Sequence, residues 1–368
     1  MDNRARILVT SAAGKTGQPV TLQLLAKGYP VRAFVRCIDE RSARLKQAGA
    51  EIFVGNQYSL NDMRRAMAGM TRGYQCAPTA PNGLHFNMVY AAAAYETGLK
   101  HTVTLGQWLS SADHASLFTR EVHLNDILIA MRPEMTVTNV NVGWFAENYL
   151  MVLDTAAHLG LLTMPLGPGH IKNNAPPSNE DIARVVVGAL TDPAAHAGKT
   201  YRPTGPELLS PDQIAAIIGK VLKRKVKYSN LTVKMFLKAL KAVPPTNYSD
   251  AAVTQLKLYT EEYRRGTFAV GGPTDAVKKV SGQDAESFEE IVRRAVAGRK
   301  DLSPSLWRRG FALSQFFNIL ATRAPDPESI ELQKDYVQLE KPVFSQDDLE
   351  WCDTHTPAGT GSKTLQAV

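Results

Sequence analysis

Hydrophobic positions change their spacing in a regular rhythm over residues 6–105. Runs of β-branched and apolar residues are typical of buried strands, and they stand at 6–10, 31–35, 51–54, 73–77 and 101–105. The stretches between these runs place apolar side chains at helical spacing, at residues 15–27, 42–48, 61–68 and 87–97. Repeated strand–helix units of this size predict an α/β fold built on a doubly wound parallel sheet.

The rhythm changes from residue 146 onward. A loop rich in proline and glycine occupies residues 165–169, and Ser178 and Ser210 each stand where a helix N-cap is expected. We therefore expect three parts. Residues 1–150 form the domain with the parallel sheet, 151–300 a smaller mixed region, and 301–368 a C-terminal extension of unknown role.

The turn after the first predicted strand has the pattern of a phosphate-binding loop. Residues 9–17 read Val-Thr-Ser-Ala-Ala-Gly-Lys-Thr-Gly, the spacing of G-x-x-G-x-x-G with Ser11 in place of the first glycine. Such a turn points backbone N–H groups at an anion, and its glycines let a pyrophosphate approach the backbone. A plain tight turn is the alternative. If the loop binds a dinucleotide, the residues expected to contact it are Thr10, Ser11, Ala13, Gly14, Lys15, Thr16 and Gly17.

The end of the second predicted strand indicates which dinucleotide. This strand ends in Val35-Arg36, where an acidic side chain would bind the ribose of NAD(H). An arginine instead favours a 2′-phosphate, so Arg36 predicts NADP(H) in preference to NAD(H), with Lys15 as a second phosphate contact. The alternative is that Arg36 is a solvated strand end.

Several stretches in a fixed order resemble one known family. They are residues 10–17, 31–36, 98–103, 138–148, 176–183 and 268–275. In this order they resemble the NmrA-like family of atypical short-chain dehydrogenases/reductases. The resemblance implies a Rossmann domain that binds NAD(P)(H), and a smaller C-terminal part that closes over a substrate. Members of that family include quinone and enone reductases, and also regulators that bind the dinucleotide and do no chemistry.

The chain departs from the larger superfamily at the residues that supply the acid. That superfamily uses a serine together with a Tyr-x-x-x-Lys pair, and no Tyr-x-x-x-Lys occurs in this sequence. Gly106-Gln107 stand where the serine is expected. Counting back from Thr138, the family position that often holds a lysine falls on His123. Because histidine can give up a proton near neutral pH, we predict His123 as the catalytic residue, the alternative being a histidine on a helix face with no role.

The resemblance also implies further contacts. Asn56 stands near the expected adenine position, and Ala77, Pro78 and Thr79 follow the fourth strand, where the ribose passes. Substrate contacts are expected from residues that follow the fifth and sixth strands, where ligands of open α/β sheets bind. These residues are Gln107, Trp108, Trp144, Asn148 and Tyr149. Core packing is the alternative for Trp108.

Three functions remain open at this stage. The first is an NADP(H)-binding oxidoreductase that transfers hydride between nicotinamide and a small apolar carbonyl, enone or quinone. The second is a regulator without catalysis that senses the NADPH/NADP⁺ ratio through a protein partner. The third is a redox-neutral lyase or isomerase on the same fold.

The composition of the chain excludes several classes of protein. The chain has 368 residues, of which 44% are hydrophobic, and a net charge of +7. No apolar run is long enough to span a membrane, and three scattered cysteines indicate neither a disulfide framework nor a metal site. We expect a cytoplasmic protein with a small-molecule substrate and no nucleic acid, and a homodimer is compatible with the sequence. Residues 220–241 are basic, which is typical of a solvated face, and the aromatic segment 306–320 lies either on a membrane surface, on the body or on a second subunit.

Overall fold

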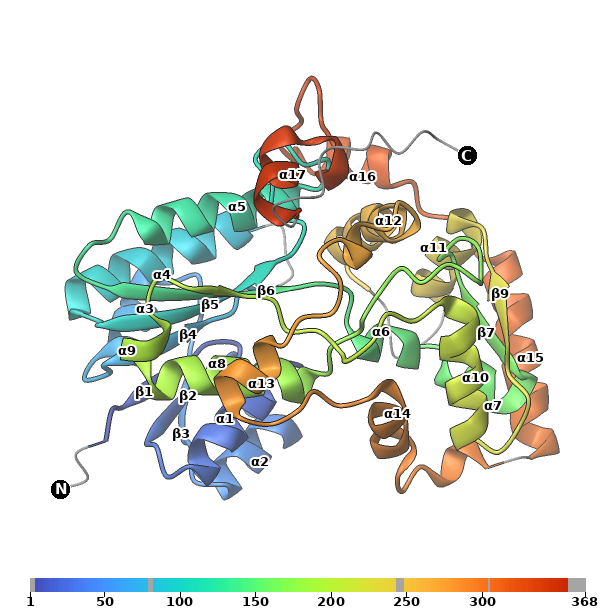
Figure 1. Ribbon diagram of the computed structural model, residues 1–368, viewed down its shortest axis with the longest axis horizontal. Coiled ribbons are helices and arrows are strands. Elements are labelled where there is room, and N and C mark those ends of the chain that lie inside the picture. Colours follow the sequence, from blue (N-terminus) through green and yellow to red (C-terminus); the bar gives the residue numbers. More distant parts are fainter. Residues whose placement is uncertain (1–3, 79–81, 243–247, 304, 357–368) are drawn as a thin grey trace.

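An open parallel sheet with helices on both faces forms one side of the molecule in the computed structural model (Figure 1), which describes residues 4–78, 82–242, 248–303 and 305–356. Its strand order is β3-β2-β1-β4-β5-β6-β8, and every neighbouring pair is parallel. The strands are β1 (Ile7–Val9), β2 (Val31–Val35), β3 (Glu51–Val54), β4 (Arg72–Gln75), β5 (His101–Gln107), β6 (Thr136–Val142) and β8 (Thr200–Tyr201). The predicted doubly wound Rossmann sheet is confirmed.

The two faces of the sheet are covered by different helices because side chains alternate along each strand. In β1, Ile7 and Val9 pack into one hydrophobic cluster, whereas Leu8 packs into another on the opposite face. The first cluster is covered by α1 (Gly17–Ala26), α2 (Glu40–Gln47), α8 (Asn179–Thr191) and α13 (Ala276–Ser281). The second is covered by α3 (Leu60–Met67), α4 (Gly83–Thr97) and α5 (Leu117–Ala130) (Figure 1).

The Rossmann sheet takes elements from beyond residue 150. Strand β8 extends its edge beside β6, and α8 packs across β4, β5 and β6. Helix α9 (Pro193–His196) connects α8 to β8. The chain therefore crosses between the sheet domain and the smaller region more often than a single boundary at residue 150 implies.

The smaller region packs around a hydrophobic cluster of its own, which includes Trp144, Tyr263 and Phe268. Two short parallel strands, β7 (Leu161–Met164) and β9 (Lys227–Asn230), pair with each other there. The helices of this region are α6 (Ala146–Leu150), α7 (Leu153–Leu159), α10 (Pro211–Val221), α11 (Val233–Ala242), α12 (Asp250–Arg264) and α14 (Phe288–Val296). The 3₁₀ turn η1 (Thr267–Ala269) follows α12.

The two predicted N-caps are confirmed. The Ser178 hydroxyl accepts from the backbone N–H of Asp181 at 3.0 Å and begins α8. Ser210 begins α10 with Pro211 in the first turn, and Gln213 returns a hydrogen bond to complete a capping box.

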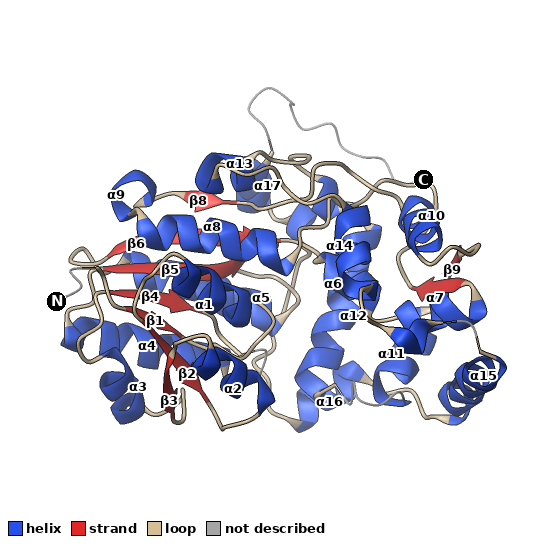
Figure 2. Cartoon of the chain, turned by 90° about the horizontal axis from the view of Figure 1, so that it is seen from below, coloured by secondary structure: helices blue, strands red, loops and turns tan. Residues whose placement is uncertain are grey.

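The C-terminal extension divides into two pieces that pack at different places. The first follows η2 (Lys300–Leu302) and consists of α15 (Leu306–Ala321), which packs on α7 and α11 at the outer edge of the smaller region (Figure 2). After α16 (Pro327–Gln333), the second piece holds η3 (Ser345–Asp347) and α17 (Leu349–His355), whose Trp351 packs against Trp108 after β5. No helix in the described ranges is long and apolar enough to cross a membrane.

Candidate functional site

The predicted phosphate loop joins β1 to α1 at the carboxyl edge of the sheet. Ser11, which replaces the first glycine of the pattern, has a φ of 48°, a left-handed conformation that glycine adopts most readily. The Ser11 hydroxyl donates to the carbonyl of Cys76 at 2.9 Å, which ties the loop to the end of β4. At the start of α1, the Thr16 side chain makes no capping hydrogen bond. No N-cap side chain therefore accepts hydrogen bonds from the N–H groups of the first turn, which leaves these groups able to bind an anion.

The glycines of the loop bring its backbone segments into close contact. A Cβ atom at Gly14 would lie 2.9 Å from the carbonyl oxygen of Ser11. A Cβ at Gly17 would lie 2.3 Å from the same oxygen and 2.9 Å from the Cα of Ala12. Gly17 thus permits the close packing of α1 against the loop, and Gly14 permits the turn itself.

Two predicted contact residues of the loop face the interior. The Thr10 hydroxyl donates to the carbonyl of Tyr74 at 2.9 Å and accepts from the N–H of Cys76 at 2.9 Å. The Thr16 hydroxyl accepts from the Tyr74 hydroxyl at 3.2 Å. These side chains join β1 to β4, whereas the Lys15 side chain is exposed and Ala13 is half-buried.

One contact of the loop was not found by sequence reasoning. The side-chain oxygen Oε1 of Gln57 accepts from the backbone N–H of Ser11 at 2.9 Å. The neighbouring Asn56, predicted near the adenine, is exposed and accepts from the N–H of Tyr58 at 3.0 Å. No motif marks Gln57, because its partner lies 46 residues earlier in the chain.

Arg36 follows β2 at the same edge of the sheet. Its side chain is exposed, and within the described ranges no hydrogen bond or ion pair engages its guanidinium. Arg32, four residues earlier in β2, differs because it pairs with Glu51 at 2.8 Å and donates to the carbonyl of Ala66. Arg36 is therefore free to take a ligand, and Arg32 holds β2 to β3 and α3.

The chain beyond β4 and β5 supplies the remaining predicted contacts. Ala77 and Pro78 are half-buried after β4, and Thr79 lies outside the described residues. Gln107 ends β5 and is buried. Its Oε1 accepts from the hydroxyls of Thr119, at 3.0 Å, and Tyr259. The Nε2 of Gln107 has no hydrogen-bond partner among the described residues, so a buried donor is left unused there.

Two predicted substrate contacts lie in the core instead. Trp144 and Tyr149 are both 0% exposed and pack with Tyr263 in the aromatic centre of the smaller region. The Tyr149 hydroxyl donates to the Tyr263 hydroxyl at 3.0 Å. Asn148, beside them on α6, is half-buried. Trp144 and Tyr149 therefore present no surface to a ligand, since an interior aromatic cluster uses their rings.

His123 lies half-buried on α5. Its Nδ1 is 3.5 Å from the hydroxyl of Ser110, in the loop that follows β5. Asp348 of the C-terminal extension lies near it: burial would raise the pKa of Asp348, but hydrogen bonds, first that from Ser111, and the nearby His123 lower it. The predicted proton donor is thus on the helix next to Gln107, beside a loop that leaves the carboxyl end of β5.

The C-terminal extension covers that loop. Val343 pairs with His114 as an isolated parallel bridge, and the Ala115 N–H donates to the carbonyl of Val343 at 2.7 Å. The Ser111 hydroxyl donates to a carboxylate oxygen of Asp348 at 2.5 Å. Residues far beyond the predicted sheet domain therefore form part of the surroundings of the β5 carboxyl end.

Trp108 sits between this extension and the smaller region. Its backbone carbonyl accepts from the indole N–H of Trp351 at 2.8 Å, and its own indole N–H donates to the carbonyl of Thr267 at 3.2 Å. The Arg202 guanidinium lies 3.7 Å from the centre of its ring, and the His355 ring lies 4.5 Å away. Trp108 is thus half-buried and held on several sides.

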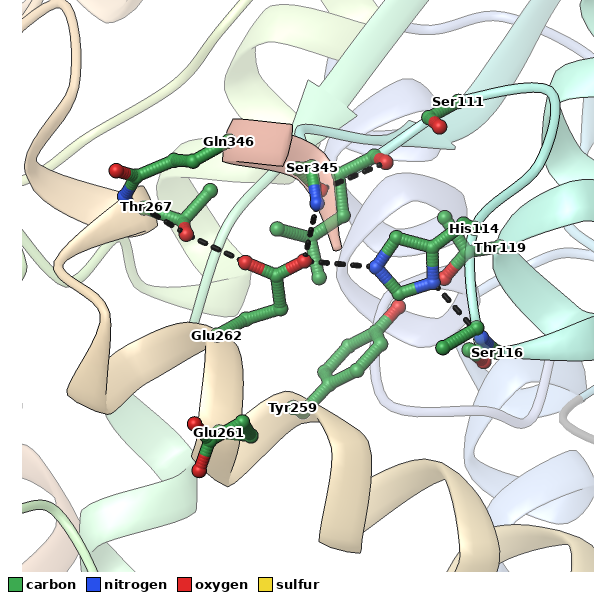
Figure 3. Close-up of polar contacts among 12 residues, drawn as sticks. Ser111, His114, Ser116, Thr119, Tyr259, Glu261, Glu262, Thr267, Ser345 and Gln346 are labelled. Carbon is green, nitrogen blue, oxygen red and sulfur yellow. Dashed lines mark hydrogen bonds and ion pairs between the residues drawn. The ribbon is translucent and has the colours of Figure 1, made fainter. Parts of the chain in front are cut away.

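A fully buried carboxylate anchors the extension (Figure 3). Glu262, at the end of α12, accepts from Nε2 of His114 at 2.8 Å, from the backbone N–H of Ser345 at 2.7 Å and from the Thr267 hydroxyl. His114 Nδ1 accepts from the Ser116 N–H at 2.8 Å, so the ring proton lies on Nε2. Burial alone would raise the pKa of Glu262, but these hydrogen bonds outweigh it and lower that pKa.

Replacing Glu262 with glutamine should destabilise the protein by about 1–3 kcal/mol, since a neutral amide leaves one buried donor without an acceptor. Because the pKa is lowered in the folded state, this stabilisation is present at neutral pH and is lost as pH falls through the folded pKa. Denaturant unfolding measures the loss, and hydrogen exchange at the Ser345 amide locates it. Glu261→Gln is the matched control, because the Glu261 carboxylate is 38% exposed. Equal stability of the two variants would contradict the anchor.

Comparisons with known proteins agree with this geometry. The family model described as "NmrA-like family" matches residues 3–292. An NAD(P)H azoreductase from Xenophilus azovorans is 28% identical over 293 residues, which cover 79% of this chain and 98% of the azoreductase. The family model ends at residue 292 and so does not cover the predicted C-terminal extension at 301–368.

Solved structures show the same fold. The NADPH-dependent quinone oxidoreductase of Escherichia coli, complexed with NADPH, is 22% identical, with a TM-score of 0.67 over 78% of this chain and 99% of its own. The negative transcriptional regulator NmrA in complex with NAD is 17% identical, with a TM-score of 0.66 over 82% of this chain and 98% of its own. At these identities the likeness shows the fold alone. It does not decide between the reductase activity of the first protein and the regulatory role of the second.

Proposed function

Because the chain belongs to the NmrA-like family, we propose that it is an NADP(H)-binding oxidoreductase. It transfers hydride between nicotinamide and a small apolar carbonyl, enone or quinone. The observation that carries this proposal is the phosphate loop, with an uncapped helix N-terminus and an unengaged Arg36 at the carboxyl edge of a parallel sheet. The azoreductase and the quinone oxidoreductase among its relatives support the class of reaction.

The loop and Arg36 would hold the dinucleotide. Backbone N–H groups of residues 15–17, at the start of α1, would bind the pyrophosphate, while the exposed side chains of Arg36 and Lys15 would meet the 2′-phosphate. The two glycines keep the backbone close enough for this contact. The preference for NADP(H) over NAD(H) therefore rests on two cations and the absence of a carboxylate at the end of β2.

Replacing Arg36 with alanine should weaken NADPH binding about ten- to a hundredfold and leave NADH binding nearly unchanged. A guanidinium on a 2′-phosphate contributes about 1–3 kcal/mol, and NADH has no such phosphate. Calorimetric titration with both nucleotides measures the effect. Arg309→Ala is the matched control, because Arg309 is likewise exposed, no hydrogen bond or ion pair engages it within the described ranges, and it lies on α15, far along the chain from the loop. Equal losses for NADPH and NADH would contradict the assignment.

The residues after β5 would arrange the acceptor end. When bound, reduced nicotinamide supplies the hydride. The unused N–H group of Gln107 can donate to a carboxamide or carbonyl oxygen, and Trp108 gives an apolar surface beside it. His123 would hold the proton that the reduced acceptor takes up.

A second function is favoured by one observation. The sequence has no Tyr-x-x-x-Lys, and a regulator shares the fold. A sensor of the NADPH/NADP⁺ ratio needs the nucleotide site and no proton donor. NADPH oxidation against a panel of quinones, enones and aldehydes separates the two functions. Turnover of at least one acceptor supports the reductase, and tight NADPH binding without any turnover supports the sensor.

A further inference from the structure

Helix α15 lies at the outer edge of the molecule (Figures 1 and 2), and several of its large apolar side chains are exposed. Leu306 is 88% exposed, Trp307 is 74% exposed and Phe317 is 66% exposed. We call the set of its large exposed side chains the α15 face, made of Leu306, Trp307, Phe311, Leu313, Phe316, Phe317 and Leu320. Contiguous apolar surface of this kind marks an interaction site.

The helix is turned so that its apolar side points away from the body. The less exposed residues of α15 recur at spacings of four and three, and they are Arg308, Ala312, Gln315 and Ile319. That stripe contains an arginine and a glutamine, whereas Leu306, Leu313, Phe317 and Leu320 lie on the opposite side. A helix that packs only on its own protein places its apolar side inward. The α15 face is therefore built to meet something else.

Hydrogen bonds hold the helix in this orientation. The Asn318 side-chain amide donates to the carbonyl of Ala242 at 3.1 Å, and the Lys238 ammonium donates to the carbonyl of Leu320 at 2.8 Å. Both partners belong to α11, on which α15 packs. The α15 face is thus fixed outward by the rest of the fold.

The charge around this face is cationic. Residues 302–325 contain Arg308, Arg309 and Arg323 and no acidic residue. Residues 213–249, which include the neighbouring α11, contain no acidic residue either. Among the carboxylates that flank the helix, Asp154, on α7, and Asp301 pair with Arg299, and Glu328 pairs with Lys257, while Asp326 follows three residues after Arg323.

We propose that the α15 face binds the surface of a membrane that carries anionic headgroups. The apolar side chains would enter the headgroup boundary while the exposed Arg309 and Arg323 meet the lipid phosphates. Sixteen residues at 1.5 Å each give a helix of about 24 Å, which lies in the surface and does not span it. A second copy fits the charge less well, because a symmetric pair would bring the same arginines together without a carboxylate from residues 302–325 between them. This inference is independent of the proposed reaction.

Co-sedimentation of the full chain with vesicles tests the proposal. We expect binding to phosphatidylcholine vesicles that contain phosphatidylglycerol, and much weaker binding to phosphatidylcholine alone. The double variant Leu313→Ser, Phe317→Ser should lower partitioning about tenfold or more, since two apolar groups no longer enter the boundary. The double variant Arg309→Glu, Arg323→Glu should lower binding to the anionic vesicles alone by about tenfold or more.

Met131→Ser is the matched control, because Met131 is 71% exposed at the end of α5, on the sheet domain. It should partition as the wild type does. Circular dichroism and NADPH affinity show that each variant folds, because α15 packs on α7 and α11 and is not part of the proposed nucleotide site. Wild-type protein that binds neither kind of vesicle overturns the proposal. So does a wild-type dimer, seen by light scattering, that becomes monomeric in the Leu313→Ser, Phe317→Ser variant, because the face would then join two copies.

Discussion

Replacing Gly14 with valine should lower NADPH affinity about a hundredfold or more while the far-ultraviolet circular dichroism spectrum stays native. The valine Cβ would lie 2.9 Å from the carbonyl oxygen of Ser11, so the loop has to shift. A shifted loop no longer directs its N–H groups at the pyrophosphate, and each hydrogen bond to a charged group contributes about 1.5–3 kcal/mol. Fluorescence or calorimetric titration with NADPH measures the loss.

Valine at two other glycines gives a control and a second loop variant. Gly310→Val is the matched control, because no atom lies within 4 Å of a Cβ built there, and its NADPH affinity should equal that of the wild type. Gly17→Val should lose thermal stability as well as affinity, since its Cβ would lie 2.3 Å from the Ser11 oxygen and displace α1. Wild-type affinity in Gly14→Val would remove the dinucleotide site, and with it the proposed reaction.

Local patterns predicted the sheet domain because each of its elements is specified by neighbouring residues. The run at residues 31–35 coincides with β2, and the run at 51–54 coincides with β3. The N-caps at Ser178 and Ser210 were predictable for the same reason, since a cap needs only the residues that follow it. The loop with Ser11 followed from its position between a strand and a helix.

Contacts between distant segments could not be predicted in this way. Gln57 reaches Ser11 across 46 residues, and Tyr259 reaches Gln107 across 152. Trp144 looked like a pocket wall because it follows β6, yet rings from α12 and η1 enclose it. No spacing rule brings these partners together, because the packing of whole helices decides which side chains meet.

The extension shows the same limit most clearly. Residues 301–368 have no motif, yet Ser345 binds the buried Glu262 carboxylate and Trp351 binds the carbonyl of Trp108. Glu262 lies near the end of α12 in the smaller region, and its partner His114 follows β5. Its other partner Ser345 lies 83 residues further along the chain than Glu262. The surroundings of the β5 carboxyl end are therefore assembled from all three predicted parts.

Replacing His123 with alanine should lower turnover of the accepted substrate by about 10²–10⁴, the usual contribution of a general acid. NADPH affinity should hardly change, because the variant removes no phosphate contact. The wild-type rate should fall as pH rises, because a donor that has lost its proton has none to give, and the variant should lack that fall. Steady-state and single-turnover measurements over a pH series, with the acceptor identified by the panel, give both quantities.

Two control variants make the assignment specific. His170→Ala removes an exposed histidine of the smaller region and should leave the rate and its pH profile unchanged. Glu121, two residues before His123 on α5, is another group there that can hold a proton at neutral pH, since burial raises its pKa to about 7, as it does that of Asp126 further along the helix. Its carboxylate lies against Gly83 at the start of α4, so Glu121→Gln should keep the pH-dependent fall that His123→Ala loses. If His123→Ala keeps full turnover and Glu121→Gln loses the fall instead, the proton comes from the glutamate, and His123 is only a residue on the helix surface.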